Sequence, residues 1–559
     1  MASRLPQNRL ILGPALLALA CISTSAPRER APVVPAATTP VLAQAWNSGT
    51  VYFLLTDRFV NGDTTNDHAA GRAHGGAVLR SFEGGDLAGV TQKLDGGYFD
   101  SLGVTAIWLT PFVEQIHAGV DEGTGKTYGF HGYWTRDWTA VDPAFGTKED
   151  LKRLIDAAHA RKIRVLMDAV INHPGPVTPS DPPWPDTWVR TTPQCTYKSY
   201  VTTVDCTLVP TLPDIRTESD APVDLPPALL EKWASEGRKD AEVASLDAWF
   251  TRTGYPRAPR FYIIKWLTDW VREYGIDGYR IDTAKHFEEG VSAELKVEAS
   301  AAYEEWRMAH LAEAVDALPF YTVGEVYGWD VTQGRNYDFG DRKVDFFTFG
   351  YDGLINFGFK WQAKGSLDSL YTSYSAALHG GALSGVTFLN YASSHDDGGP
   401  LDRDRTDPMG TGTRLLLAPG TAQVYYGDEL ARPLVVSGAD GDANLRSTMP
   451  WDRLTQPATA RVLSHWRLLG RFRKNHPAVG AGEHRTLQAS PLIFSRTLGT
   501  DTVLVALDQK SGVRVVPVFG LFAEGARVRD AYSGSVATVT GGKVTFAGGG
   551  SVVLLARDQ

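Results

Sequence analysis

An arginine and an aspartate lie two residues apart in the stretch 278–286, which reads GYRIDTAKH. If this stretch is an extended strand, Arg280 and Asp282 point to the same face, because side chains alternate across a strand. A guanidinium beside a carboxylate keeps that carboxylate ionised and fixes its orientation. The pair is suited to prepare a carboxylate nucleophile, although an isolated Arg-x-Asp motif is more often a buried structural ion pair.

Eight β-rich runs alternate with helical patterns along the 559-residue chain. The runs are 51–55, 106–109, 164–169, 277–282, 321–325, 344–349, 386–391 and 422–426. Between the third and fourth runs, apolar residues at spacings of three and four from Phe261 to Tyr274 form one helical stripe. Eight such units predict an α/β fold built on a (β/α)8 TIM barrel.

Charged and polar residues gather where four of these runs end. They are Asp168 to His173, Asp282 to His286, Glu325, and His395 to Asp397. In a barrel of this type the chemistry lies at the carboxyl ends of the strands. The sequence therefore predicts one site that contains several carboxylates and histidines.

The remaining segments predict a domain order around the barrel. We expect a signal peptide at 1–21, a flexible linker at 22–45, the barrel at 46–172 and 256–480, an inserted domain B at 173–255 and a C-terminal antiparallel β-sandwich at 481–559. The apolar run 10–20 is too short to span a bilayer. Residues 17–21 resemble a lipoprotein processing site, which predicts a lipid on Cys21, with ordinary cleavage as the alternative.

Composition narrows the partners and the compartment. A net charge of −9 without a basic run argues against nucleic acid. Fifteen Trp and twenty-one Tyr fit either core packing or stacking against sugar rings, and composition does not separate the two. If Cys21 carries lipid, Cys195 and Cys206 remain and can close a short disulfide loop in an oxidising compartment.

Four segments resemble the hallmark regions of the α-amylase family, glycoside hydrolase family 13. They are 168–173 (DAVINH), 278–286, 323–326 (VGEV) and 394–396 (SHD), in the family's order. The runs 393–396, 415–420 and 426–429 look most like the periplasmic α-amylases of Gram-negative bacteria. Ser394 stands where many members have Asn, at a position that supplies no carboxylate.

The resemblance implies roles for three acids. Asp282 would be the nucleophile, Glu325 the general acid/base and Asp396 the third carboxylate, which stabilises the distorted transition state. Retaining hydrolysis uses two carboxyl groups about 5–5.5 Å apart. Glu325 must start protonated, so its pKa is expected to be raised, while Asp282 beside Arg280 is expected to stay ionised.

The same resemblance implies substrate contacts, each with a plainer structural alternative. The implied set is Tyr133, His173, Arg280, Lys285, His286, His395, Asp442 and Arg446. Tyr133 would stack on the sugar at the cleavage position, or simply belong to the core. Asp168 resembles the residue that braces the arginine of strand four, so we expect it to support Arg280.

Two calcium sites are also implied, since carboxylate, amide and carbonyl oxygens are the ligands that Ca²⁺ prefers. The first, between barrel and inserted domain, would use Asn172, Asp214 and the carbonyl of His286. The second, an N-terminal loop, would use Asn61, Asp63, Asn66, Asp67, Gly84 and Asp86. An Asn/Asp/Gly loop of this kind is usually only a turn.

The leading hypothesis is an exported, endo-acting α-amylase, periplasmic or anchored to the outer membrane, that acts as a monomer on starch or maltodextrins. Secretion is the alternative location. A transglycosylase uses the same acids but usually carries further C-terminal domains, which favours hydrolysis here. Exo-action on maltodextrins stays open, and a non-catalytic glucan-binding protein is disfavoured because all three acids are present.

Overall fold

The computed structural model describes residues 38–72, 75–509, 512–548 and 550–558. The predicted signal peptide and Cys21 lie outside the described residues. Within the described residues, no helix is long and apolar enough to cross a membrane.

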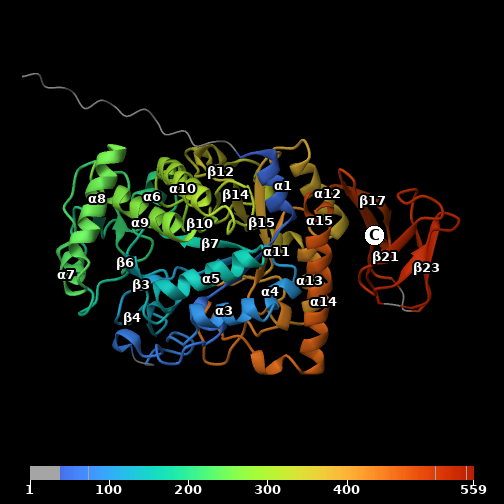
Figure 1. The fold of residues 1–559 in the computed structure, drawn as a ribbon, viewed down its shortest axis with the longest axis horizontal. Coiled ribbons are helices and arrows are strands. Elements are labelled where there is room, and N and C mark those ends of the chain that lie inside the picture. Colours follow the sequence, from blue (N-terminus) through green and yellow to red (C-terminus); the bar gives the residue numbers. More distant parts are fainter. Residues whose placement is uncertain (1–37, 73–74, 510–511, 549, 559) are drawn as a thin grey trace, which may run out of the picture.

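A closed barrel of eight parallel strands forms the centre of the molecule, as predicted (Figure 1). In barrel order from the N-terminal strand, the strands are β1 (Thr50–Leu54), β2 (Ala106–Leu109), β7 (Arg164–Ala169), β10 (Gly278–Ile281), β11 (Tyr321–Gly324), β14 (Gly353–Asn356), β15 (Thr387–Tyr391) and β16 (Thr421–Tyr425). Nearly every residue in them is buried, because helices cover the outside of a parallel barrel.

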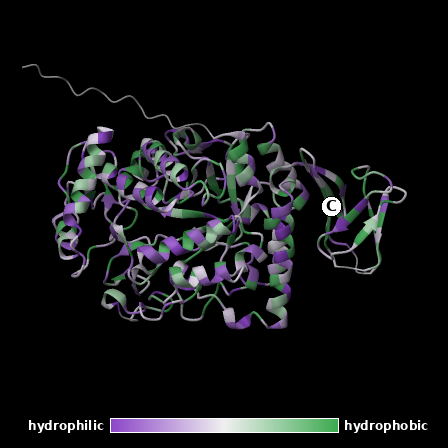
Figure 2. Cartoon of the chain, viewed as in Figure 1, coloured by the Kyte–Doolittle hydropathy of each residue, from purple (hydrophilic) through white to green (hydrophobic). Residues whose placement is uncertain are grey.

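The covering helices are amphipathic (Figure 2). The main ones are α3 (Leu87–Asp95), α5 (Lys148–Ala160), α9 (Pro259–Tyr274), α10 (Glu289–Ala309), α12 (Leu367–Leu378), α13 (Pro408–Leu416) and α14 (Pro457–Asn475). Helix α5 begins with a capping box in which Thr147 and Asp150 satisfy each other's backbone amides. In α9 the predicted stripe is buried from Phe261 to Tyr274.

The prediction for strand six was wrong. Residues 344–349 form the end of a hairpin strand, β13 (Lys343–Asp345), paired with β12 (Asn336–Asp338), and then a 3₁₀ turn, η4 (Phe346–Phe349). The barrel strand is β14, which begins with a glycine and therefore carries a weak strand signal. Gly353 is needed there because a Cβ atom would lie 2.1 Å from Thr387 Oγ1 of the neighbouring strand.

A long excursion separates β7 from α9. It contains the short pair β8 (Val189–Arg190) and β9 (Asp214–Ile215) and the helices α6 (Val201–Val204), α7 (Pro227–Ser235) and α8 (Lys239–Thr253). The Cys195–Cys206 disulfide lies within it. In Figure 1, α7 and α8 lie at the end of the molecule opposite the C-terminal strands. The domain limits given above stay a prediction.

The C-terminal strands form two antiparallel sheets, as predicted. The larger contains β17 (Glu483–Ala489), β18 (Leu492–Leu498), β19 (Asp501–Ala506), β24 (Val553–Arg557), β21 (Arg527–Asp530) and β22 (Val536–Thr538), and the smaller pairs β20 (Arg514–Pro517) with β23 (Lys543–Phe546). Both sheets contribute to one apolar core, with Leu504 on the larger and Val516 on the smaller. The sandwich therefore has a core of its own.

Helical structure begins inside the segment 22–45 that we predicted as a linker. Helix α1 (Pro40–Ser48) begins after Thr39, whose side chain accepts a hydrogen bond from Leu42 N. Trp46 stacks on Tyr321 with ring centroids 3.8 Å apart. These contacts make residues 40–45 part of the folded barrel.

Candidate active site

One buried guanidinium organises the carboxyl end of the barrel. The register places Arg280 of β10 opposite Asp168 of β7. Arg280 Nη1 donates to Asp168 and Asp282, each at 2.7 Å, and Nη2 lies 2.9 Å from Glu325 Oε2. Three carboxylates from three successive strands are thus held around one cation, and Arg280 contacts Asp282 as their spacing predicts.

Asp168 holds Arg280 from below, the bracing role that we expected. Its Oδ1 contacts the guanidinium, while Oδ2 accepts hydrogen bonds from the Tyr133 hydroxyl at 2.7 Å and Trp108 Nε1 at 3.0 Å. Both carboxylate oxygens of Asp168 therefore accept hydrogen bonds, which fix the orientation of its side chain. With Arg280 only 1% exposed, the guanidinium contacts the acids from behind and is not part of the cleft lining.

Above these acids is an open cleft with an empty volume of about 820 Å³. Asp282, Glu325 and Asp396 all line it. The other lining residues are Glu122, His131, Tyr133, Trp134, His173, Thr283, His286, Tyr327, His395, Asp442 and Arg446. The structure thus brings together the three predicted acids and six of the eight predicted substrate contacts.

Lys285 and Arg280 are the two predicted contacts outside this lining. The Lys285 ammonium donates to the Tyr327 carbonyl at 2.9 Å and to the Tyr337 hydroxyl at 3.1 Å. Two of its hydrogen bonds are therefore made within the protein and not to the cleft. Tyr327 was missed from the sequence, although its ring is 48% exposed at the cleft. An aromatic residue two positions after the acid that ends β11 was the available signal.

Burial raises the pKa of the two central acids. The pKa of Glu325 is raised to about 8, with the charges of Asp282 and Asp396 adding to the effect of burial. Burial also raises the pKa of Asp282 to about 7 despite the opposing charge of Arg280. The expected rise in the pKa of Glu325 is therefore present. The guanidinium does not keep the pKa of Asp282 low, because burial outweighs it and the charge of Asp168 adds to the rise.

Asp396 differs from its two partners. Burial acts to raise its pKa, but His395 and Arg280 outweigh that effect and the net shift is downward. Its side chain is 36% exposed and lies 3.5 Å from His395 Nε2. The cleft thus contains one acid with a lowered pKa beside two with raised values.

The cleft histidines are neutral near pH 7. Burial lowers the pKa of His173 and of His395 to about 4 and that of His286 to about 3. Neutral imidazoles donate or accept one hydrogen bond at each nitrogen. The Tyr133 ring stacks on His395 with centroids 5.3 Å apart, which exposes an aromatic and imidazole wall to the cleft. Such a wall suits contacts with sugar hydroxyls and ring faces.

Asp442 and Arg446 line the cleft as an ion pair. Arg446 Nη2 lies 2.6 Å from Asp442 Oδ2, and its Nε donates to the His395 carbonyl. Arg80 holds the other oxygen of Asp442 at 3.0 Å. The predicted Asp-x-x-x-Arg pair is therefore a rigid polar group that faces the cleft.

Comparisons with known proteins agree with this geometry. The family described as "Alpha amylase, catalytic domain" matches residues 53–204. The periplasmic alpha-amylase of Escherichia coli is 37% identical over 519 residues, which cover 82% of this chain and 72% of that protein. This chain belongs to the α-amylase family. It is a glycoside hydrolase by that membership.

Solved α-amylase structures share the fold. The Anoxybacillus α-amylase superposes with a TM-score of 0.65 at 24% identity, covering 92% of this chain and 99% of that one. CldA, described as a cyclomaltodextrin glucanotransferase with a three-domain ABC distribution, gives a TM-score of 0.61 at 20% identity, covering 91% and 99%. The same fold therefore occurs in proteins named for two different activities.

Two residues of the first predicted calcium site have buried oxygens that are free to bind a cation. Asn172 Oδ1 and Asp214 Oδ1 are buried and have no hydrogen-bond partner among the described residues. Ile215 N donates to the Asn172 carbonyl, so the two segments are adjacent. Burial raises the pKa of Asp214 to about 9 despite the charge of Arg190. Two unpartnered oxygens, one of them a disfavoured buried carboxylate, form a donor set that fits a cation.

An acidic group close by was missed from the sequence. Ligand oxygens of Asp205, Glu218 and Glu288 lie within 4.8 Å of one another. Arg190 links this group to the first predicted site through contacts with Asp205 and Asp214. The three acids come from separate parts of the chain, so no local sequence motif predicts the group.

The second predicted calcium loop is assembled but largely satisfied by the chain. Asn61 Nδ2 donates to Asp67 Oδ1 at 2.8 Å, and both side chains crowd Gly84. The carboxylate of Asp86 accepts backbone amides of Gly62, Asp63 and Gly89, and it caps α3. Asn66 Oδ1 is buried and unpartnered. Because amides already occupy Asp86, this set fits a cation less well than the first.

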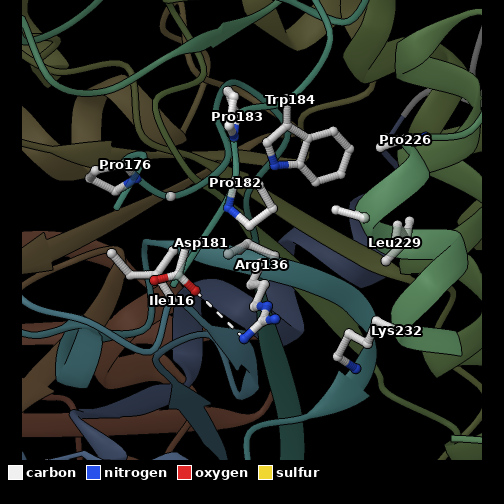
Figure 3. A pocket seen from close by; sticks show the side chains of 13 residues that line it. Ile116, Arg136, Pro176, Asp181, Pro182, Pro183, Trp184, Pro226, Leu229 and Lys232 are labelled. Carbon is white, nitrogen blue, oxygen red and sulfur yellow. Dashed lines mark ion pairs between the residues drawn. The ribbon is translucent and has the colours of Figure 1, made fainter. Parts of the chain in front are cut away.

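A second hollow lies between the inserted segment and residues 116, 135 and 136, and it shares no lining residue with the cleft (Figure 3). Prolines and Trp184 form one side of it, and Leu229 and Lys232 of α7 form the other. The Arg136–Asp181 ion pair, 3.6 Å long, lies at its base. None of the three predicted acids lines this hollow.

Proposed function

We propose that this chain is an endo-acting α-amylase that hydrolyses internal α-1,4-glucosidic bonds of starch and maltodextrins with retention. The observation that carries the proposal is the arrangement of Asp282 and Glu325 on one guanidinium, with Asp396 beside them in an open cleft. Retaining enzymes need two carboxyl groups close enough for direct attack on the sugar, about 5–5.5 Å apart.

The residues divide the reaction between them. Glu325, with its raised pKa, donates a proton to the glycosidic oxygen as the bond breaks. Asp282 attacks the anomeric carbon from the other side and forms a covalent glycosyl-enzyme. Glu325, now ionised, takes a proton from the water that releases the sugar. Asp396, ionised throughout, accepts hydrogen bonds from sugar hydroxyls in the distorted transition state.

A transglycosylase is the second candidate, because it differs only in the acceptor. The expectation that such an enzyme carries further domains does not separate the two here, since the three-domain CldA is named a cyclomaltodextrin glucanotransferase. Exo-action on short maltodextrins is a third candidate within the same mechanism. Product analysis decides among them.

The deciding experiment follows polymer length and reducing ends together on soluble starch with calcium present. Endo-hydrolysis shortens the polymer quickly while few reducing ends form. Release of one short sugar from intact polymer indicates exo-action, and cyclic or lengthened products indicate transfer. Asp282→Asn is the control, and unchanged activity in that variant contradicts the mechanism.

Calcium and export complete the proposal. Asn172 and Asp214 would hold a Ca²⁺ ion that pins the inserted segment to the barrel, and their unpartnered buried oxygens support this. The similarity to an Escherichia coli enzyme named a periplasmic alpha-amylase supports export. Mass spectrometry of the mature N-terminus tests whether Cys21 carries a lipid.

A further inference from the structure

We infer that Lys360 is a positioning residue that fixes the loop carrying Asp396 through an ion pair with Asp397. This inference rests on the proposed function, since it concerns the third acid of that mechanism. Neither residue was singled out from the sequence as functional.

The ion pair is buried and reinforced. Lys360 is 4% exposed and Asp397 6% exposed, and the ammonium contacts Asp397 Oδ2. The Tyr391 hydroxyl, at the end of β15, donates to the same oxygen at 2.5 Å. The other oxygen, Oδ1, accepts the amide of Gly399 at 3.3 Å. Asp397 therefore ties strand β15, its own loop and the turn after β14 together.

Asp396 lies 3.5 Å from His395 Nε2, and its position otherwise depends on the loop that carries it. Its neighbour on one side, His395, is anchored by its carbonyl to Arg446 Nε at 2.8 Å. On the other side, Gly398 and Gly399 follow Asp397, and the next backbone anchor is the bond from Leu401 N to the Ala392 carbonyl. Because residues 398 and 399 are glycines, Asp397 supplies the side-chain contacts that hold the loop after Asp396, while the Ser393 hydroxyl holds the loop before it by donating to Asp428.

Lys360 reaches Asp397 from the short helix that follows the neighbouring strand β14. It lies in the short helix α11 (Phe359–Gln362), which follows the carboxyl end of β14. Burial lowers the pKa of Lys360 to about 8, and the charge of Asp396 acts in the opposite direction, so the ammonium is within electrostatic reach of the third acid. Removing the ammonium would leave a buried, uncompensated carboxylate next to Asp396.

The test compares two buried Lys–Asp pairs at opposite ends of the barrel. Lys296 contacts Asp352 at 2.6 Å and the Phe320 carbonyl at 2.6 Å, and both partners directly precede barrel strands, away from the cleft. Lys360→Met and Lys296→Met each break a buried pair. Both are expected to lower Tm, and only Lys360→Met is expected to lower the rate of the chemical step.

The readout is kcat and KM for maltoheptaose, measured below the Tm of every variant. A displaced catalytic group can cost about 100-fold in rate, so we expect Lys360→Met to lower kcat about 10- to 100-fold with little change in KM. Lys360→Arg keeps the charge and is expected to recover part of the rate. Lys296→Met is expected to keep kcat within about twofold, since it lies outside the site.

A milder variant covers the case in which Lys360→Met does not fold. Tyr391→Phe removes one hydrogen bond to Asp397 and keeps the ion pair, and we expect kcat to fall about fivefold, the equivalent of one hydrogen bond. Unchanged kcat in Lys360→Met or Tyr391→Phe, or an equal fall in Lys296→Met, overturns the inference. Absence of turnover by the unmodified enzyme instead contradicts the proposed function, so the two failures are distinguishable.

Discussion

Replacing Arg280 by lysine tests whether one guanidinium sets the protonation of the proposed catalytic acids. Arg280 contacts Asp168 and Asp282 at 2.7 Å and Glu325 at 2.9 Å. A lysine ammonium is a single charged centre on a flexible stem, whereas the guanidinium is a planar fork. The substitution therefore keeps the net charge but cannot keep all three contacts.

The magnitude follows from the pKa of Asp282. An adjacent arginine lowers a carboxyl pKa by about 1–3 units. If Asp282 loses this contact, its pKa rises from about 7 to about 8–10. The ionised fraction at pH 7 then falls from about one half to about one tenth or less, so kcat/KM at that pH falls roughly 5- to 500-fold.

The assay is kcat/KM on maltoheptaose from about pH 4 to about pH 10, where the two limbs report the acids of the free enzyme. The unmodified enzyme is expected to give a bell, since Asp282 must be ionised and Glu325 protonated, with pKa values of about 7 and about 8. In Arg280→Lys the acidic limb is expected to move upward. Arg446→Lys, a second buried cleft arginine, is the control and is expected to raise KM without moving that limb.

An unshifted acidic limb in Arg280→Lys would refute the electrostatic reasoning. A loss of the same size at every pH would do so as well, because it would indicate disturbed geometry and not altered protonation. Thermal unfolding of each variant shows whether the fold persists. The deep burial of Arg280 makes this control necessary.

Three further predictions use the same structure. Asp282→Asn is expected to lower kcat on the order of 10⁴-fold. Its Tm is expected to stay level or rise, because the substitution removes a buried group that can carry a charge. A parallel fall in Tm would contradict this expectation. Because burial raises the pKa of Asp214 to about 9, the metal-free protein loses stability as the pH rises from about 4 toward 9. Chelation is therefore expected to lower Tm at about pH 8, and added calcium is expected to restore it. The Asp214→Asn variant is expected to show neither response. Cys195→Ser with Cys206→Ser is expected to reduce the free energy of unfolding by about 3 kcal/mol in a denaturant titration, since an 11-residue separation is no longer closed; an unchanged midpoint would argue against it.

The prediction of the fold succeeded where the local signal and the barrel agreed, and failed where they differed. Strands such as β7 and β10 are apolar runs that the periodicity locates directly. Strand β14 begins with Gly353, and the aromatic run just before it has the stronger strand propensity. Only the closed barrel, in which β11 and β15 need a strand between them, places β14 correctly. Helix α1 escaped notice because its apolar contacts are with distant Tyr321.

The sequence by itself determined the acids and their order, because Asp282, Glu325 and Asp396 each end or follow a strand in a recognisable segment. Tertiary structure decided what those acids experience. The pKa of Asp282 is raised because burial outweighs a guanidinium that several carboxylates share. Lys360 reaches Asp397 only because β14 and β15 are neighbours in the barrel. Local spacing fixes which groups are present, whereas burial and contacts across strands, which depend on the whole fold, fix their charge and position.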